Sequence, residues 1–179
     1  MAITLDGTAG ITAQAINLTT PLPVVGGGTG MTAIQIFHVR EEQPAGTHGG
    51  ASVAGNQVRV LNTIVRNSIV GASLATNQIT LPAGGYKIEA YAPAHTVVRH
   101  RIRLVNVTDT VVIMLGLSAG TNVDADTHSF IMGTFTLSGT KALNITHFTQ
   151  SATATLGLGL STDDTFVNVY TSVLITKIE

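Results

Sequence analysis

The sequence predicts an all-β protein built as a sandwich of short strands. Segments rich in β-branched residues recur about every ten residues, and Gly, Pro or Asn separates them. No segment of about twelve residues combines an amphipathic helical period with capping residues at its ends. Hydrophobic residues make up 44% of the chain but charged residues only 11%, against about 25% in a typical soluble domain. This shortage of charge predicts that subunits bury apolar faces against one another.

The first five expected strands lie between residues 33 and 107. Three are short and rich in β-branched residues, namely AIQIFHV (33–39), QVRVLNTIV (57–65) and NQITL (77–81). Two more, GYKIEAYA (85–92) and RHRIRLVNV (99–107), alternate as a strand does when one face is buried. The alternation separates Tyr86, Ile88, Ala90 and Ala92 from Lys87, Glu89 and Tyr91, and His100, Ile102 and Leu104 from three arginines.

Five further strands are expected in the second half of the chain. VVIMLGL (111–117) is continuously apolar, as expected of a strand that is covered on both faces. The others are SFIMGTFTL (129–137), ALNITHF (142–148), ATLGLGL (154–160) and TFVNVYTSVLITKI (165–178). The last strand is expected in the middle of its sheet, because a long apolar edge strand would promote aggregation. The set indicates a sandwich or jelly roll, with a closed up-and-down barrel as the alternative.

Residues 1–32 differ in composition from the rest of the chain. They are rich in Thr, Gly and Ala and contain two similar phrases, GTAGIT (7–12) and GTGMT (28–32). Such a segment cannot form a core alone, so we expect an extended arm (1–32) followed by a head domain (33–179). The residues expected to dock the arm on a partner are Pro21, Pro23, Gly26, Gly27, Gly28 and Gly30.

Composition also excludes several classes of partner and chemistry. The chain has no cysteine, so it has no disulfide and no thiolate metal site. Its formal net charge is −1, with no basic block and no aromatic ladder, which argues against nucleic-acid binding. The longest apolar run, Val111 to Leu117, is far shorter than the ~20 residues that span a bilayer. The first residues lack the charged and apolar regions of a signal peptide, so we expect synthesis in the cytoplasm without secretion.

Three groups of residues are candidates for contacts. Asp124, Asp126 and His128 form an oxygen-rich loop that could hold a metal ion, although it lacks the other ligands of a calcium loop. Arg99, Arg101 and Arg103 share a strand face and could bind an anionic receptor group, or pair with Glu89 on the preceding strand. The expected subunit interface is a leucine strand with a glycine face, comprising Leu156, Gly157, Leu158, Gly159 and Leu160.

The sequence does not predict an enzyme. It contains no nucleophile elbow, and the glycine run at 26–30 lacks the Gly-Lys-Ser/Thr ending of a phosphate-binding loop. No cofactor is expected. His100 and His147 lie in strand patterns and are expected to be core or interface groups whose ring nitrogens are satisfied by hydrogen bonds. A pair of carboxylates for glycoside hydrolysis need not be close in the chain, so a polysaccharide-cleaving spike stays open as an alternative.

Several phrases, in order, resemble the C-terminal domains of phage tail-fibre and related virion proteins. They are NQITLPAGGYKIEAYAPA (77–94), VVRHRIRLVN (97–106), GTFTLSGTKALNITHFTQ (133–150) and VYTSVLITKI (169–178). These domains are similar to the trimeric jelly roll of the tumour necrosis factors and to the globular head of complement. The resemblance covers about residues 33–179 and implies a jelly-roll head that forms a homotrimer.

The resemblance implies a structural protein at the virion surface, and the phrases of the arm resemble segments of phage fibre proteins. The chain is too short for a long fibre, which favours a short fibre or spike or a capsid decoration protein. The arm would dock on a capsid or tail protein, and the head is a candidate for binding a host receptor such as a cell-surface glycan. The alternatives are the receptor-binding tip of a tail fibre and a cellular sugar- or ligand-binding jelly roll.

Overall fold

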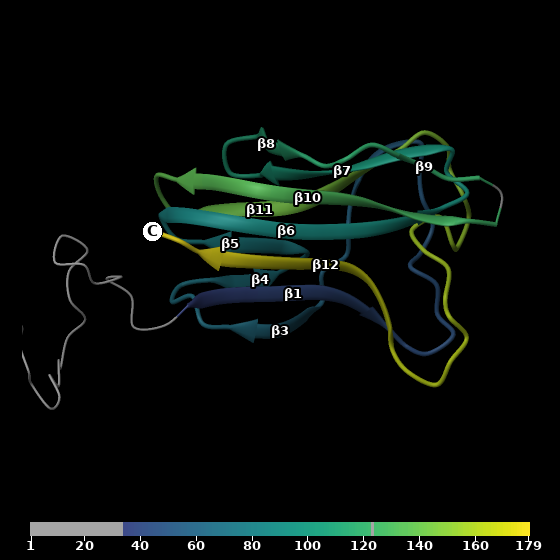
Figure 1. The fold of residues 1–179 in the computed structure, drawn as a ribbon, viewed down its shortest axis with the longest axis horizontal. Coiled ribbons are helices and arrows are strands. Elements are labelled where there is room, and N and C mark those ends of the chain that lie inside the picture. Colours follow the sequence, from purple (N-terminus) through teal and green to yellow (C-terminus); the bar gives the residue numbers. More distant parts are fainter. Residues whose placement is uncertain (1–33, 123) are drawn as a thin grey trace, which may run out of the picture. The chain divides into compact units, whose positions relative to one another are not determined.

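The strands pair into two antiparallel sheets that lie face to face (Figure 1). The computed structural model describes residues 34–122 and 124–179, and Gln35–Glu179 form one compact unit. The six arm residues predicted to dock on a partner lie outside the described residues. The all-β prediction is confirmed, and the architecture is a two-sheet sandwich rather than an up-and-down barrel.

One sheet has five strands and the other has seven. The five-stranded sheet has the order β10 (Asp126–Leu137), β6 (Gly84–His95), β12 (Asn168–Lys177), β1 (Gln35–Gln43) and β3 (Thr63–Asn67). The seven-stranded sheet has the order β4 (Ser73–Ala75), β5 (Gln78–Leu81), β11 (Lys141–Thr149), β7 (Arg99–Asn106) and β8 (Val111–Leu115). In addition, β2 (Gly55–Val58) pairs with β11, and β9 (Ala119–Gly120) pairs with β7. The described residues contain no helix long and apolar enough to cross a membrane.

Alternate residues of the strands form the core between the sheets. Tyr86 and Ile88 of β6 are fully buried, as are Ile102 and Leu104 of β7, which confirms the alternation predicted for both strands. β12 lies in the middle of its sheet, where Val173 is paired with Val39 of β1 on one side and Ala90 of β6 on the other. Its predicted central position is therefore confirmed.

The single strand expected at 57–65 is wrong, because β2 and β3 belong to different sheets. The residues between them carry the chain across the core, where Leu61 is buried. The side chain of Asn62 accepts a hydrogen bond from the Glu42 amide and donates one to the Glu42 carbonyl, both at 2.8 Å. These bonds hold the crossing segment against β1.

The strand expected at 154–160 is also wrong, because these residues form a loop of turns. Leu158 donates to the Gly50 carbonyl at 3.0 Å, and the Gly159 carbonyl accepts from Gly49 at 2.9 Å. The glycines are required by packing inside the chain. A Cβ at Gly157 would lie 2.3 Å from Ser52 Oγ, and one at Gly159 would lie 2.4 Å from a ring carbon of Tyr170. The alternation of leucine and glycine therefore does not indicate a strand. It reflects the close approach of this loop to other segments of the same chain.

The apolar segment 111–117 is not covered on both faces by the described chain. β8 is an edge strand of the seven-stranded sheet, and its partner β7 lies on one side only. Val111, Leu115 and Leu117 are 54%, 55% and 67% exposed. A continuous apolar run is typical of a central strand, but here it forms a short edge strand and the residues that follow it.

Candidate functional site

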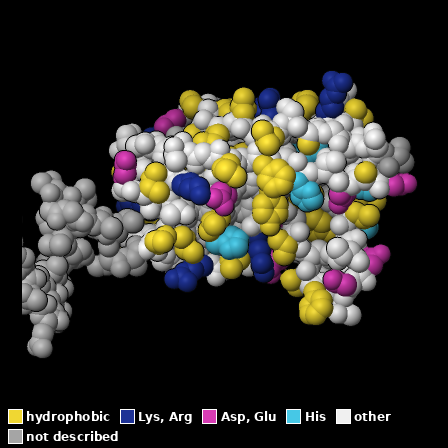
Figure 2. Space-filling view, in the orientation of Figure 1, with side chains coloured by type: hydrophobic (Ala, Val, Ile, Leu, Met, Phe, Trp, Pro, Cys, Tyr) yellow, Lys and Arg dark blue, Asp and Glu magenta, His cyan; other side chains and the backbone are white. Residues whose placement is uncertain are grey.

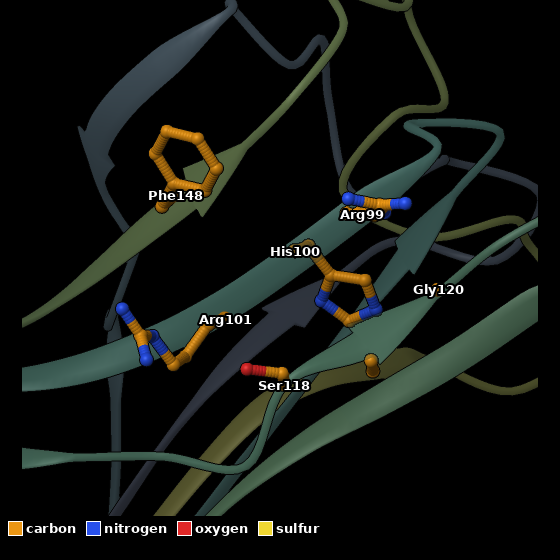
Figure 3. Close-up of a pocket in the computed structure, with 7 residues that line it drawn as sticks. Arg99, His100, Arg101, Ser118, Gly120 and Phe148 are labelled. Carbon is orange, nitrogen blue, oxygen red and sulfur yellow. The ribbon is translucent and has the colours of Figure 1, made fainter.

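A hollow of about 440 Å³ opens on the outward side of the seven-stranded sheet (Figure 3). We call it the arginine hollow. It is lined by Arg99, His100, Arg101, Ser118, Ala119, Gly120 and Phe148. Figure 3 shows that three of these residues follow one another on β7, that Phe148 comes from β11, and that Ser118 and Gly120 come from another segment. The hollow therefore brings together three parts of the chain.

The arginines share one face of β7 because successive side chains of a strand point to opposite sides. His100 lies between Arg99 and Arg101 but points into the core, where it is 2% exposed. In the pairing of β7 with β11, Arg101 is opposite Phe148. The guanidinium carbon of Arg103 lies 5.9 Å from the centre of the Phe148 ring, a cation–π arrangement that holds the ring in place.

None of the three arginines forms an ion pair within residues 34–122 and 124–179. The predicted pairing with Glu89 is wrong, because β6 and β7 belong to different sheets and Glu89 pairs with Lys87 at 2.5 Å. The Nε atom of Arg103 is buried and has no hydrogen-bond partner in the described structure. The seven-stranded sheet thus presents positive charge that no carboxylate of the described chain balances.

The metal candidates Asp124, Asp126 and His128 do not form a cluster. Asp126 binds His95 instead, with 2.6 Å between Oδ1 and Nδ1, and its other oxygen accepts from the Leu160 amide at 3.2 Å. The His128 ring lies beside Tyr91 and Phe130, with centroid distances of 6.4 and 6.2 Å. In the described residues, no three His, Asp or Glu side chains are arranged to hold a metal ion.

A second candidate surface is the outward side of the five-stranded sheet, which we call the open face. Tyr91 of β6 and Phe130 of β10 are opposite each other in the pairing, with ring centroids 6.1 Å apart. Both are exposed, at 40% and 47%, and the neighbouring Met132 is 75% exposed. Figure 2 shows hydrophobic side chains gathered across the middle of this face. Such an apolar surface is typical of a protein–protein contact.

The open face also holds a hollow of about 390 Å³. It is lined by His38, Glu89, Ala90, Tyr91, Phe130, Ile131, Met132, Ser172 and Leu174. Nε2 of His38 lies 3.0 Å from Ser172 Oγ, and burial, with a smaller effect of Arg40, lowers the pKa of His38. Beside the hollow, Lys87 pairs with Glu89 and Arg40 with Glu42, each at 2.5 Å, whereas Arg66, opposite His38, forms no ion pair within the described residues. The open face is therefore apolar, with two internal ion pairs and Arg66, which is unpaired in the described chain, at its rim.

The expected interface residues Leu156–Leu160 do not belong to the open face. Leu158 is buried within the chain, and Gly157 and Gly159 pack against Ser52 and Tyr170. Leu160, which is 43% exposed, borders a third hollow beside Val169 and Tyr170. The open face was missed because its apolar residues come from β6, β10 and β12, which are far apart in the sequence.

A charged cluster in the core was also missed by the sequence analysis. The Arg59 guanidinium donates to Glu41 Oε2 at 2.9 Å and to Thr171 Oγ1 at 2.6 Å, and both charged side chains are fully buried. Two Arg59 nitrogens also donate to the Leu158 carbonyl at 3.1 Å. Burial lowers the pKa of Arg59, and Glu41 opposes this shift. One signal was present: Glu41 follows Phe37 and Val39 at the period of two that points a strand residue inward.

Two buried histidines, His100 and His147, lie next to this cluster; within the described residues the expected hydrogen bonds are present at both nitrogens of His100 but at only one of His147. Nδ1 of His100 is 2.9 Å from Nε2 of His147, and Nε2 of His100 is 2.8 Å from Thr127 Oγ1. Burial lowers the pKa of His100 to about 4 and that of His147 to about 2, and nearby Arg59 adds to both shifts. Nδ1 of His147 is buried without a partner in the described structure. Both rings are neutral at pH 7.

No protein-family model matches the chain, and no curated protein matches it. Solved structures do match. Murine APRIL is 11% identical with a TM-score of 0.55, over 81% of this chain and 99% of that chain. The globular domain of zebrafish complement 1qA protein is 15% identical with a TM-score of 0.52, over 82% and 98%. The tumour necrosis factor Eiger from S. frugiperda is 10% identical with a TM-score of 0.53, over 80% and 92%.

At these identities the likeness establishes the fold alone. It confirms the predicted jelly roll and its likeness to the tumour necrosis factors and the complement head. The virion part of the resemblance stays a prediction.

Proposed function

We propose that this protein is a non-enzymatic binding module in which three jelly-roll heads associate through their open faces. The observation that carries the proposal is the apolar patch of Tyr91, Phe130 and Met132 on a sheet of a chain with few charges. Aromatic residues and methionine are enriched at protein interfaces, and charged residues are depleted from interface cores. The number three comes from the resemblance of the sequence to trimeric heads.

The occupant of the open face that we propose is a second copy of this chain. Four of the charged residues at its edge are paired within the chain and Arg66 is unpaired in the part described, so the face brings little unbalanced charge to a contact with its own copy. Burying an apolar patch of this kind lowers the free energy of association by about 25 cal/mol per Å² of apolar surface.

Met132→Glu is expected to convert the trimer into monomers at micromolar concentration. A carboxylate placed at a buried contact without a partner costs about 3 kcal/mol or more, which corresponds to about 100-fold in a dissociation constant. Sedimentation velocity and native mass spectrometry of the wild type and the variant measure the change, and far-ultraviolet circular dichroism checks that the variant is folded.

Leu115→Glu is the matched control. Leu115 is 55% exposed but lies on β8 of the other sheet, so this variant is expected to remain a trimer. A wild-type protein that is monomeric at these concentrations, or a control that dissociates as Met132→Glu does, would refute trimerisation through the open face.

Binding rather than catalysis is supported by the chemistry of the three hollows. Retaining and inverting glycosidases place two carboxylates across one cleft. The arginine hollow has no carboxylate among its lining residues, and the other two hollows have one each, Glu89 and Asp126. Release of reducing ends from capsular or cell-wall polysaccharides by the purified protein would contradict this role.

We further propose that the trimer works at a virion surface, as a short fibre, spike or decoration protein made in the host cytoplasm. The support is the order of fibre-like phrases in the head and the glycine- and threonine-rich segment 1–32. Deleting residues 2–30 is expected to abolish incorporation into particles while the head still forms a trimer. Unchanged incorporation would refute docking through the arm, and a trimer that no particle takes up would favour a cellular ligand-binding role.

A further inference from the structure

We propose that the arginine hollow binds an acidic sugar, whose anionic group pairs with Arg99 and Arg101 and whose ring packs against Phe148. This deepens the binding role proposed above by naming its ligand class and its site. The hollow is formed within a single chain, on the sheet opposite the open face. Its ligand binding therefore does not depend on trimerisation.

The charge of the hollow is the first step of the inference. Arg99, Arg101 and Arg103 project from one face of β7, and no described carboxylate forms an ion pair with any of them. Elsewhere in the described residues, Arg40, Arg59, Lys87 and Lys141 each have an acidic partner, whereas Arg66 and Lys177 stand singly without one. Guanidinium groups pair with planar oxyanions through parallel hydrogen bonds. The three unpaired arginines thus attract an external anion.

The shape of the hollow is the second step. Its volume of about 440 Å³ falls within the range of small-molecule sites, about 300–1,000 Å³. Phe148 supplies one apolar surface, and the neighbouring Arg103 holds that ring. Ser118 and the backbone of Ala119 and Gly120 supply polar groups on another side. A ligand with an anion, an apolar ring face and hydroxyl groups matches these three surfaces together.

A nucleic acid matches the hollow less well than an acidic sugar. Single-stranded nucleic acid needs a basic groove several nucleotides long, with successive aromatic rings on which bases stack. The hollow has one aromatic ring, and the whole chain has a formal net charge of −1. A discrete site with two guanidinium groups and a single ring favours one sugar unit with one acidic substituent.

The test compares two sugars that differ by one group. Galacturonate and galactose are titrated into the full-length protein, and backbone amide shifts at Ser118–Gly120 are followed by NMR. We expect galacturonate to bind and galactose not to bind. Galactose 6-sulfate tests whether the acidic group is a sulfate instead of a carboxylate, and inorganic phosphate tests for an anion without a sugar.

Arg101→Gln and Arg99→Gln are each expected to raise the dissociation constant for the acidic sugar about tenfold, the loss expected for one charge-assisted hydrogen-bonded contact. Arg66→Gln is the matched control, because it removes the same charge from an exposed position on β3 and is expected to leave binding unchanged. Met132→Glu is also expected to bind the acidic sugar as the wild type does. A failure of the sugar site can therefore be distinguished from a failure of the proposed trimer.

Four results would overturn the inference. They are binding of galactose as tight as that of galacturonate, no binding of either acidic sugar, phosphate binding as tight as sugar binding, and equal losses in Arg66→Gln and Arg101→Gln. A single-stranded oligonucleotide is tested as a competitor of galacturonate for the hollow. If it bound there with a lower dissociation constant than any sugar, the hollow would be assigned to nucleic acid instead. Preference for galactose 6-sulfate over galacturonate would support the inference and identify the acid as a sulfate.

Discussion

Arg59→Met is expected to lower the free energy of unfolding by about 3–5 kcal/mol, the cost of leaving one member of a buried ion pair without its partner. Glu41 would remain fully buried next to an apolar side chain, with the neutral donors Thr171 and Gln43 as its remaining side-chain partners. The Leu158 carbonyl would lose both of its Arg59 donors, so the loop at 154–160 would loosen as well. Chemical denaturation at a fixed protein concentration measures the loss.

The double variant Glu41→Leu/Arg59→Met separates the ion pair from general packing. Replacing both members of a buried pair with apolar residues is often neutral or stabilising, so we expect it to recover most of the stability lost in Arg59→Met. A double variant no more stable than the single one would show that Arg59 acts mainly by holding Leu158 and Thr171. In either case the comparison measures how far the charge itself contributes.

Acidification from pH 7 to pH 5 is expected to destabilise the head by about 4 kcal/mol, through His100 and His147 together. Burial lowers their pKa values to about 4 and about 2 from an ordinary value of 6.5. The unfolded chain therefore takes up protons on these residues as the pH falls below 6.5, while the folded head does not. The unfolded state binds more protons, so the free energy of unfolding decreases with falling pH until each folded pKa is passed.

Thermal or urea unfolding between pH 7.5 and pH 5, at one protein concentration, measures this dependence. His100→Leu/His147→Leu removes both titrating groups and is expected to flatten the acid side of the stability curve. Thr127→Val is the control: it removes the hydrogen bond to His100 Nε2 and should cost about 1 kcal/mol at every pH, with the slope retained. A wild-type stability that is constant down to pH 5 would show that the rings are charged in the folded head.

The sequence predicted the strands whose burial alternates, because a period of two is visible in a single segment. Tyr86 and Ile88 of β6 and Ile102 and Leu104 of β7 show this clearly. The strand predicted at 154–160 was wrong, because there the period of two comes from glycines that allow two segments of the chain to pack closely. The split of 57–65 into β2 and β3 was not visible either, because the turn depends on Asn62 reaching back to β1.

The candidate site was predictable only in part. The arginine face of β7 was predicted directly from RHRIR. That Glu89 does not pair with these arginines follows from its position in the other sheet, which the sequence did not reveal. The Arg59 cluster joins Glu41 and Thr171, which are 18 and 112 positions away from it. The open face joins residues of three strands in the same way. Contacts over such distances follow from topology, which a single sequence does not reveal.

The position of β12 in the middle of its sheet has a consequence for the order in which the chain can fold during synthesis. β12 pairs with both β1 and β6, and β11 pairs with β2, β5 and β7. The central strand of each sheet therefore leaves the ribosome after all the strands with which it pairs. Until then those neighbours have unpaired backbone edges, and contacts over long sequence distances fold slowly. The seven-stranded sheet is therefore complete only when residues 141–149 are available, and the five-stranded sheet only when residues 168–177 are available.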